Sequence, residues 1–154
     1  DAQQEYAEAD RDGDGLIEYA QKFRSSEGKR DGLFWPTTEG EPLSPFGPLA
    51  AQVKAEGYTA KDARPVPLHG YYYRILTSQG QDAPGGAYDY MVNGNMIGGY
   101  ALVAYPARWG ASGVMTFVCN HDGVVYQKNL GETTAELASK MARFNPDASW
   151  QKAE

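Results

Sequence analysis

The spacing of hydrophobic positions becomes strand-like from residue 69 onward. Four stretches there are rich in β-branched and aromatic residues, as strands are. They cover residues 69–76, 97–106, 113–120 and 123–129. The sequence Asn-His-Asp-Gly between the last two suits a tight turn, because Asn and Asp tolerate left-handed backbone and Gly favours it. This pattern predicts a four-stranded antiparallel sheet built as a meander, with a long connection at residues 77–96.

Before residue 69, the apolar positions follow helical spacing. Residues 2–9 have the pattern of the last turns of a helix, and residues 17–23 predict a second short helix. A third helix is expected over residues 48–57, since Pro48 suits a first turn and Gly57 suits a C-terminal cap. These N-terminal helices are expected to pack on the sheet.

One more helix is predicted near the C-terminus. Thr133 and Glu136 have the spacing of a capping box, and Pro146 ends the helical pattern. The face expected to be buried consists of Leu137, Met141 and Phe144. The 154 residues suffice for one hydrophobic core but hardly for two. We therefore expect a single α+β domain over residues 1–154.

Charge and hydropathy exclude several classes of partner. The net charge is −6 and no run of Lys or Arg forms a basic patch, so nucleic acid and anionic membrane surfaces are poor partners. The longest apolar stretch, residues 97–107, is interrupted by glycines and is too short to span a bilayer. The chain begins with polar residues rather than with Met, so we expect a mature or trimmed product of a longer precursor.

A metal loop is the most specific local signal. Residues 10–21 match the twelve positions of an EF-hand loop, with Gly15 at the sharp turn and Ile17 where an apolar residue anchors the loop to the core. The expected ligands are Asp10, Asp12, Asp14, the carbonyl of Leu16, Glu18 and Gln21. The predicted ion is Ca²⁺ in a structural role, because Mg²⁺ demands a tighter octahedral geometry.

The last loop position departs from the pattern, since Gln21 offers one neutral oxygen where a Glu normally binds through two. Weak affinity is expected, about 10⁻⁴–10⁻³ M, with Glu18 partly substituting. Alternatively, the aspartates only cap a helix that begins near Leu16. Three carboxylates in five residues repel one another without a cation, and a cap needs only one, so the sequence favours the metal loop.

No catalytic constellation is evident. Cys119 and His121 lie at a strand end and turn without an orienting third group, and His69 has no neighbours with the spacing of a zinc site. A hydrolase that uses one of them remains an alternative. The tyrosines of residues 71–73 and 88–90 predict core packing or, alternatively, a tyrosine-rich surface for self-assembly or a protein partner.

Long segments of the chain resemble a bacterial family catalogued as domain of unknown function 2950. They include "EYAQKFRSSEGKRDGLFWP", "HGYYYRILTSQG", "APGGAYDYMVNGNMIGGYALVAYPARWG" and "MARFNPDASW". The chain resembles the C-terminal half of these proteins. This likeness implies export to the periplasm or the extracellular space, and no established activity. Cys119 stands where the family more often has an aliphatic residue, which argues against a catalytic thiol.

A second resemblance concerns residues 99–126, which are similar to the closing β-hairpin of type IV pilin-like and pseudopilin subunits. It implies a helix packed on an antiparallel sheet and suggests assembly into a filament. The leading hypothesis is a non-enzymatic exported module with a structural Ca²⁺ loop. The alternatives are a subunit of a pilin-like surface assembly and an uncharacterised hydrolase.

Overall fold

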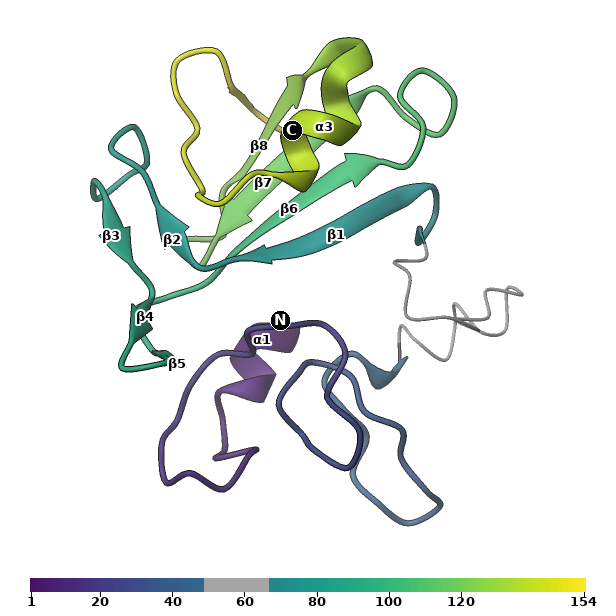
Figure 1. Ribbon diagram of the computed structural model, residues 1–154, viewed down its shortest axis with the longest axis vertical. Helices are drawn as coiled ribbons and strands as arrows, with labels where there is room; N and C mark the ends of the chain where they lie inside the picture. The colour runs from purple at the N-terminus through teal and green to yellow at the C-terminus, as the bar shows by residue number, and fades with distance from the viewer. Residues whose placement is uncertain (49–66) are drawn as a thin grey trace.

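A five-stranded antiparallel sheet forms the centre of the α+β fold (Figure 1). The computed structural model describes residues 1–48 and 67–154. The strands, in their order across the sheet, are β1 (Tyr71–Leu76), β6 (Ala101–Pro106), β7 (Met115–Asn120), β8 (Val125–Asn129) and β9 (Gln151–Lys152). The first four lie in the predicted stretches. The prediction of a four-stranded sheet is wrong because β9 is a two-residue, exposed strand without apolar alternation, paired through Gln151 to Gln127 of β8.

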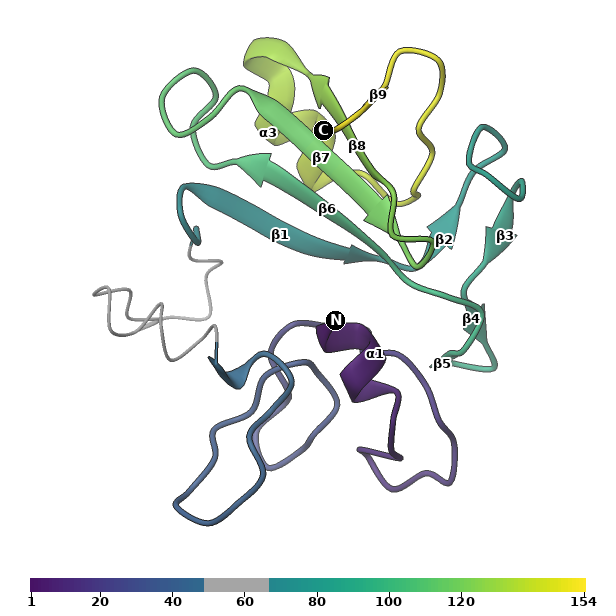
Figure 2. The ribbon, with the colours of Figure 1, turned by 180° about the vertical axis from the view of Figure 1, so that it is seen from behind.

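One face of the sheet carries a helix, and the N-terminal part lies elsewhere. In both views, α3 (Thr134–Ser139) covers one face, whereas residues 1–48 lie beyond the edge formed by β1 (Figures 1 and 2). Arg74 of β1 ties α3 to the sheet, since its Nη1 donates to the carbonyls of Ala138 and Met141 at 2.8 and 3.1 Å. The expectation that N-terminal helices pack on the sheet is therefore corrected. The N-terminal part lies instead against the β1 edge, where Phe23 contacts the ring of Tyr73.

Two hydrophobic clusters form the core. The larger one, between the sheet, α3 and the long connection, includes Leu76, Tyr90, Met96, Val103, Val118 and Phe144. The smaller one belongs to the N-terminal part and consists of Tyr6, Ala20, Leu33 and Trp35. Ile75 packs against both clusters, so β1 joins the two parts of the molecule.

The long connection between β1 and β6 is folded into two small hairpins. They pair β2 (Ser78–Gln79) with β3 (Tyr88–Asp89) and β4 (Met91–Val92) with β5 (Asn95–Met96). The buried amide of Gln79 organises the first hairpin, because it accepts from the Tyr90 hydroxyl at 2.8 Å and donates to the carbonyls of Pro84 and Gly86. With its polar atoms satisfied, Gln79 can be buried without the penalty of an unpaired group.

Two of the helices predicted for the N-terminal part do not form as expected. Within residues 2–9 the helix α1 covers Ala2–Tyr6, and the helix predicted over residues 17–23 is wrong. The N–H of Ala20 donates to the Gln3 side chain instead of to a helical carbonyl. Tertiary hydrogen bonds thus override the helical spacing. The prediction over residues 48–57 lies almost wholly outside the described residues.

The C-terminal helix begins one residue after Thr133 and ends early. A short 3₁₀ turn (Gly131–Thr133) precedes α3, and Thr133 makes no capping hydrogen bond. The predicted continuation to residue 144 is wrong, because Phe144 forms a strand-like bridge to β2: its N–H donates to Ser78 at 2.9 Å. Among the described residues, no helix has the length and apolar character needed to cross a bilayer.

The end of α3 yields a direct test of burial. Phe144 is 0% exposed, whereas Leu137, expected on the same buried face, is 51% exposed. We predict that Phe144→Ala lowers the free energy of unfolding by about 3–5 kcal/mol, the usual cost of emptying a buried aromatic site. Leu137→Ala is the control and changes it by less than about 0.5 kcal/mol. Urea denaturation measures both values, and equal losses would contradict this assignment of burial.

Candidate metal centre

Asp10, Asp12 and Asp14 gather their carboxylates on one exposed loop after α1. Their ligand oxygens lie within 4.8 Å of one another. In the described parts of the chain, this is the one group of three or more acidic, His or Cys side chains close enough to share an ion. The spacing that predicted the loop therefore brings these three side chains together.

The loop's own backbone holds these carboxylates in place. Asp10 accepts hydrogen bonds from the N–H groups of Gly13 and Gly15, at 2.7 and 2.9 Å. Asp14 accepts from Leu16 at 2.8 Å. Gly13 and Gly15 have φ values of +82° and +90°, which glycine adopts without strain. The N–H groups of Gly15 and Gly13 also lower the pKa of Asp10, which favours its charged form.

The one cation within the loop sequence does not neutralise the aspartates. Arg11 turns back toward α1, where Nη2 donates to the carbonyl of Glu5 at 2.8 Å and Nε to that of Tyr6 at 3.2 Å. The guanidinium thus donates hydrogen bonds to the last carbonyls of the helix. Three acidic groups remain on the loop, an arrangement suited to a hard cation with oxygen ligands.

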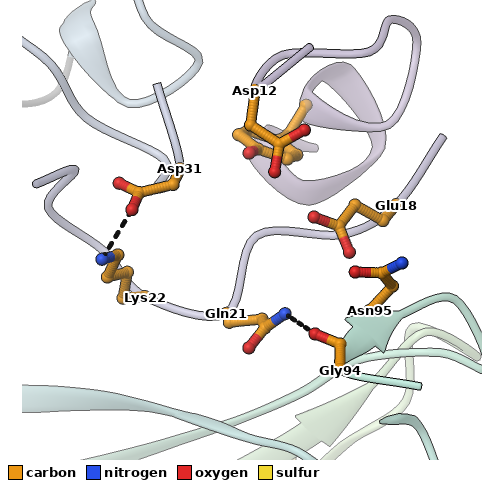
Figure 3. Close-up of a pocket in the computed structure, with 8 residues that line it drawn as sticks. Asp12, Glu18, Gln21, Lys22, Asp31, Gly94 and Asn95 are labelled. Atoms are coloured by element: carbon orange, nitrogen blue, oxygen red, sulfur yellow. Dashed lines mark hydrogen bonds and ion pairs between the residues drawn. The ribbon is translucent and has the colours of Figure 1, made fainter. Parts of the chain in front are cut away.

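The later positions of the loop lie differently from the expectation. Glu18 is only 9% exposed, and its Oε2 accepts the backbone N–H of Met96 at 3.0 Å. Gln21 donates through Nε2 to the carbonyl of Gly94 at 2.8 Å (Figure 3). Both side chains therefore contact the β4–β5 hairpin, and Glu18 lies outside the aspartate group.

The expectation that Ile17 anchors the loop to the core is wrong. Ile17 is 55% exposed, and the preceding Leu16 is exposed as well. The chain is anchored one step later, where Tyr19 donates its N–H to Met96 at 2.8 Å and stacks edge-on against Tyr100. An extended segment that bonds to β5 cannot also present Ile17 on an inner helix face.

A cavity of about 220 Å³ separates the aspartate loop from the hairpin. Its lining consists of Tyr6, Asp12, Glu18, Gln21, Lys22, Asp31, Gly94 and Asn95 (Figure 3). Burial, together with the charges of Asp12 and Asp14, raises the pKa of Glu18. The ammonium of Lys22 forms an ion pair with Asp31, at 2.8 Å, and not with Glu18. The sequence did not predict this ion pair, because Lys22 and Asp31 are nine positions apart, a separation that gives no periodic signal.

Among the described residues, Cys119 and His121 do not form a catalytic relay. The Nε2 of His121 faces both the Tyr88 hydroxyl at 3.2 Å and the Asp122 carboxylate at 3.8 Å, while its Nδ1 is buried against Gly99. A relay needs the carboxylate and the nucleophile on opposite ring nitrogens. Burial raises the pKa of the Cys119 thiol, which disfavours the reactive thiolate.

The chain belongs to the family described as Protein of unknown function (DUF2950), whose model matches residues 1–153. This match gives no support to the narrower expectation of a C-terminal half. Comparison with curated proteins yields no match, and comparison with solved structures yields none either. The pilin-like resemblance of the β-hairpin is therefore without support.

Asp31 leads to a pH-dependent prediction. Burial would raise its pKa, but hydrogen bonds from Lys22 and Ser26 outweigh this effect and lower the pKa to about 2. A lowered carboxyl pKa stabilises the fold above the unfolded-state value of about 3.9 and loses that effect as the pH falls toward 2.

We predict that Asp31→Asn lowers the free energy of unfolding by about 2 kcal/mol at pH 7. The difference from the parent protein shrinks below about pH 4 and vanishes near pH 2. Urea denaturation at several pH values measures it. Glu39→Gln, at an exposed site, is the control. A difference that is constant with pH would contradict a role for the Asp31 charge.

Proposed function

We propose that this member of the DUF2950 family is a non-enzymatic, exported bacterial module whose N-terminal loop binds Ca²⁺ for structural support. The observation that carries the proposal is the convergence of Asp10, Asp12 and Asp14 within 4.8 Å on a glycine-shaped loop. The resemblance found in the sequence supports export, to a compartment where calcium sites of millimolar affinity are common.

The donor set fits Ca²⁺ better than other metals. All candidate ligands are oxygens, which suit hard cations and not the softer metals that prefer Cys or His. The three carboxylates are exposed, so an ion can enter with part of its water shell. The Leu16 carbonyl is the next oxygen along the loop in the twelve-residue pattern, whereas Glu18 accepts the N–H of Met96 with one of its oxygens. Ca²⁺ tolerates such irregular coordination, whereas Mg²⁺ does not.

The position of the loop indicates what the ion does. It links α1 to the segment of residues 18–21, which hydrogen-bonds to β5 through Tyr19 and Glu18. A cation that removes repulsion among the aspartates would stabilise both neighbours. With Gln21 turned toward Gly94, the loop lacks a bidentate Glu, so we expect affinity of about 10⁻⁴–10⁻³ M.

Self-assembly through a tyrosine-rich surface is the alternative function. Tyr73 on β1 and Tyr88 on β3 are its exposed aromatic side chains. Each already contacts a neighbour, Phe23 and His121 respectively, so their exposed area is small for an interface. Sedimentation that finds one monomeric species at all concentrations would exclude this alternative.

Calcium should raise the melting temperature. At about one hundred times Kd, ligand linkage stabilises a protein by about 2.7 kcal/mol, which corresponds to about 5–10 °C for a chain of this size. Thermal unfolding in EDTA and in about 10 mM CaCl₂ measures the shift, since that concentration is one hundred times a Kd of 10⁻⁴ M. Identical midpoints would remove the calcium proposal.

Asp12→Asn isolates the effect of the metal. The one hydrogen bond recorded for the Asp12 side chain among the described residues is long, 3.3 Å from the N–H of Asp14, so little structure is lost with it. We predict a loss of calcium affinity of about tenfold or more, measured by calorimetric titration. Asp147→Asn is the matched control: Asp147 accepts a similar turn hydrogen bond, from Ser149, outside the loop. If both variants bind calcium equally, the aspartate loop is not the site.

A further inference from the structure

A second, larger cavity lies between two turns of the N-terminal part. Its volume is about 610 Å³, within the range of small-molecule sites. Its lining consists of Arg24, Ser25, Ser26, Glu27, Gly28, Lys29, Arg30, Trp35, Pro36 and Glu41. None of these residues belongs to the aspartate loop or to the cavity beside it.

Three cations on the rim of this cavity form no close ion pair with a described residue. Arg24, Lys29 and Arg30 are exposed, and none forms an ion pair with an acidic side chain in the described parts of the chain. The lining also holds two acids, Glu27 and Glu41, and Glu41 accepts the N–H of Thr38 at 3.3 Å. Three cations against two carboxylates give the cavity a small positive excess in a chain whose net charge is −6.

Trp35 lines the cavity, and Arg30 covers its ring. Trp35 is 5% exposed, and its indole Nε1 is buried with no acceptor among the described residues. The Arg30 guanidinium lies over the indole ring, 5.6 Å from the centroid. Because the ring face is covered, stacking of an uncharged sugar is disfavoured. The adjacent guanidinium favours a ligand that supplies oxygen atoms.

The turn that carries the cations is held in shape from within. Asp31 accepts hydrogen bonds from the Ser26 N–H at 2.7 Å and its hydroxyl at 3.0 Å. At Gly32 a Cβ would lie 2.7 Å from the Ser25 nitrogen, so the two sides of the turn approach closely. A site shaped before binding loses less conformational entropy when a ligand arrives.

We propose that this cavity binds a small anion through a phosphate or carboxylate group. The guanidinium groups of Arg24 and Arg30 contact its oxygens, and Lys29 adds a third positive charge. Guanidinium groups match the planar or tetrahedral oxygens of such anions through paired hydrogen bonds. This site is independent of the calcium loop, so either proposal can fail without the other.

Nuclear magnetic resonance of the indole N–H groups tests the proposal. Inorganic phosphate and citrate are titrated separately at constant ionic strength without calcium, and Trp35→Phe identifies the Trp35 resonance. We expect a saturable shift of that resonance alone. The Trp109 indole, which donates to Asn129 at 2.9 Å, is the internal reference. Saturation by phosphate only, or by citrate only, identifies which group is recognised.

Two variants and a control decide between a site and general charge. Arg24→Gln and Arg30→Gln each weaken the anion affinity by about tenfold or more, since each removes a charge-assisted contact. Lys140→Gln, directly after α3, removes the same charge elsewhere and leaves the affinity unchanged. Arg24→Gln keeps the contact between Arg30 and Trp35, so this variant remains informative if Arg30→Gln unfolds. Shifts that never saturate, or equal weakening in all three variants, would overturn the proposal.

Discussion

The buried pair of hydrogen bonds between Gln3 and Ala20 determines the shape of the N-terminal part. The Gln3 amide donates to the carbonyl of Ala20 and accepts its N–H, both at 2.8 Å. This pair joins α1 to the segment that leaves the aspartate loop. With Arg11 bonded to the end of the helix, the loop is fixed at its beginning as well as at its end. The three carboxylates are therefore held close together, where their negative charges repel one another. A bound cation would relieve this repulsion.

The same segment carries the contact between the two halves of the molecule. Tyr19 donates its N–H to the carbonyl of Met96, and Glu18 accepts the N–H of Met96. Gln21 donates to the carbonyl of Gly94 in the adjoining turn. The aspartate loop therefore lies at a junction between the N-terminal part and the β4–β5 hairpin. An ion bound there would stabilise both parts, which is the structural role proposed for it.

The sequence predicted the features that depend on residues close together in the chain. The four main strands follow from their alternation, and the aspartate group follows because its hydrogen bonds span at most five residues. The roles of Glu18 and Gln21 could not be predicted, since their partners lie 78 and 73 residues away. The helix over residues 17–23 failed for the same reason. Its spacing is helical, but Gln3 and Met96 offer its backbone groups buried partners.

Amide hydrogen exchange, with and without calcium, tests the central claim most directly. If a cation stabilises the loop and the junction behind it, calcium slows exchange at Gly15 and Leu16, and also at Tyr19 and Met96. The amide of Phe117, in the middle of β7, serves as the reference and keeps its rate. Exchange rates at Gly15, Leu16, Tyr19 and Met96 that are the same in calcium and in EDTA would contradict the account.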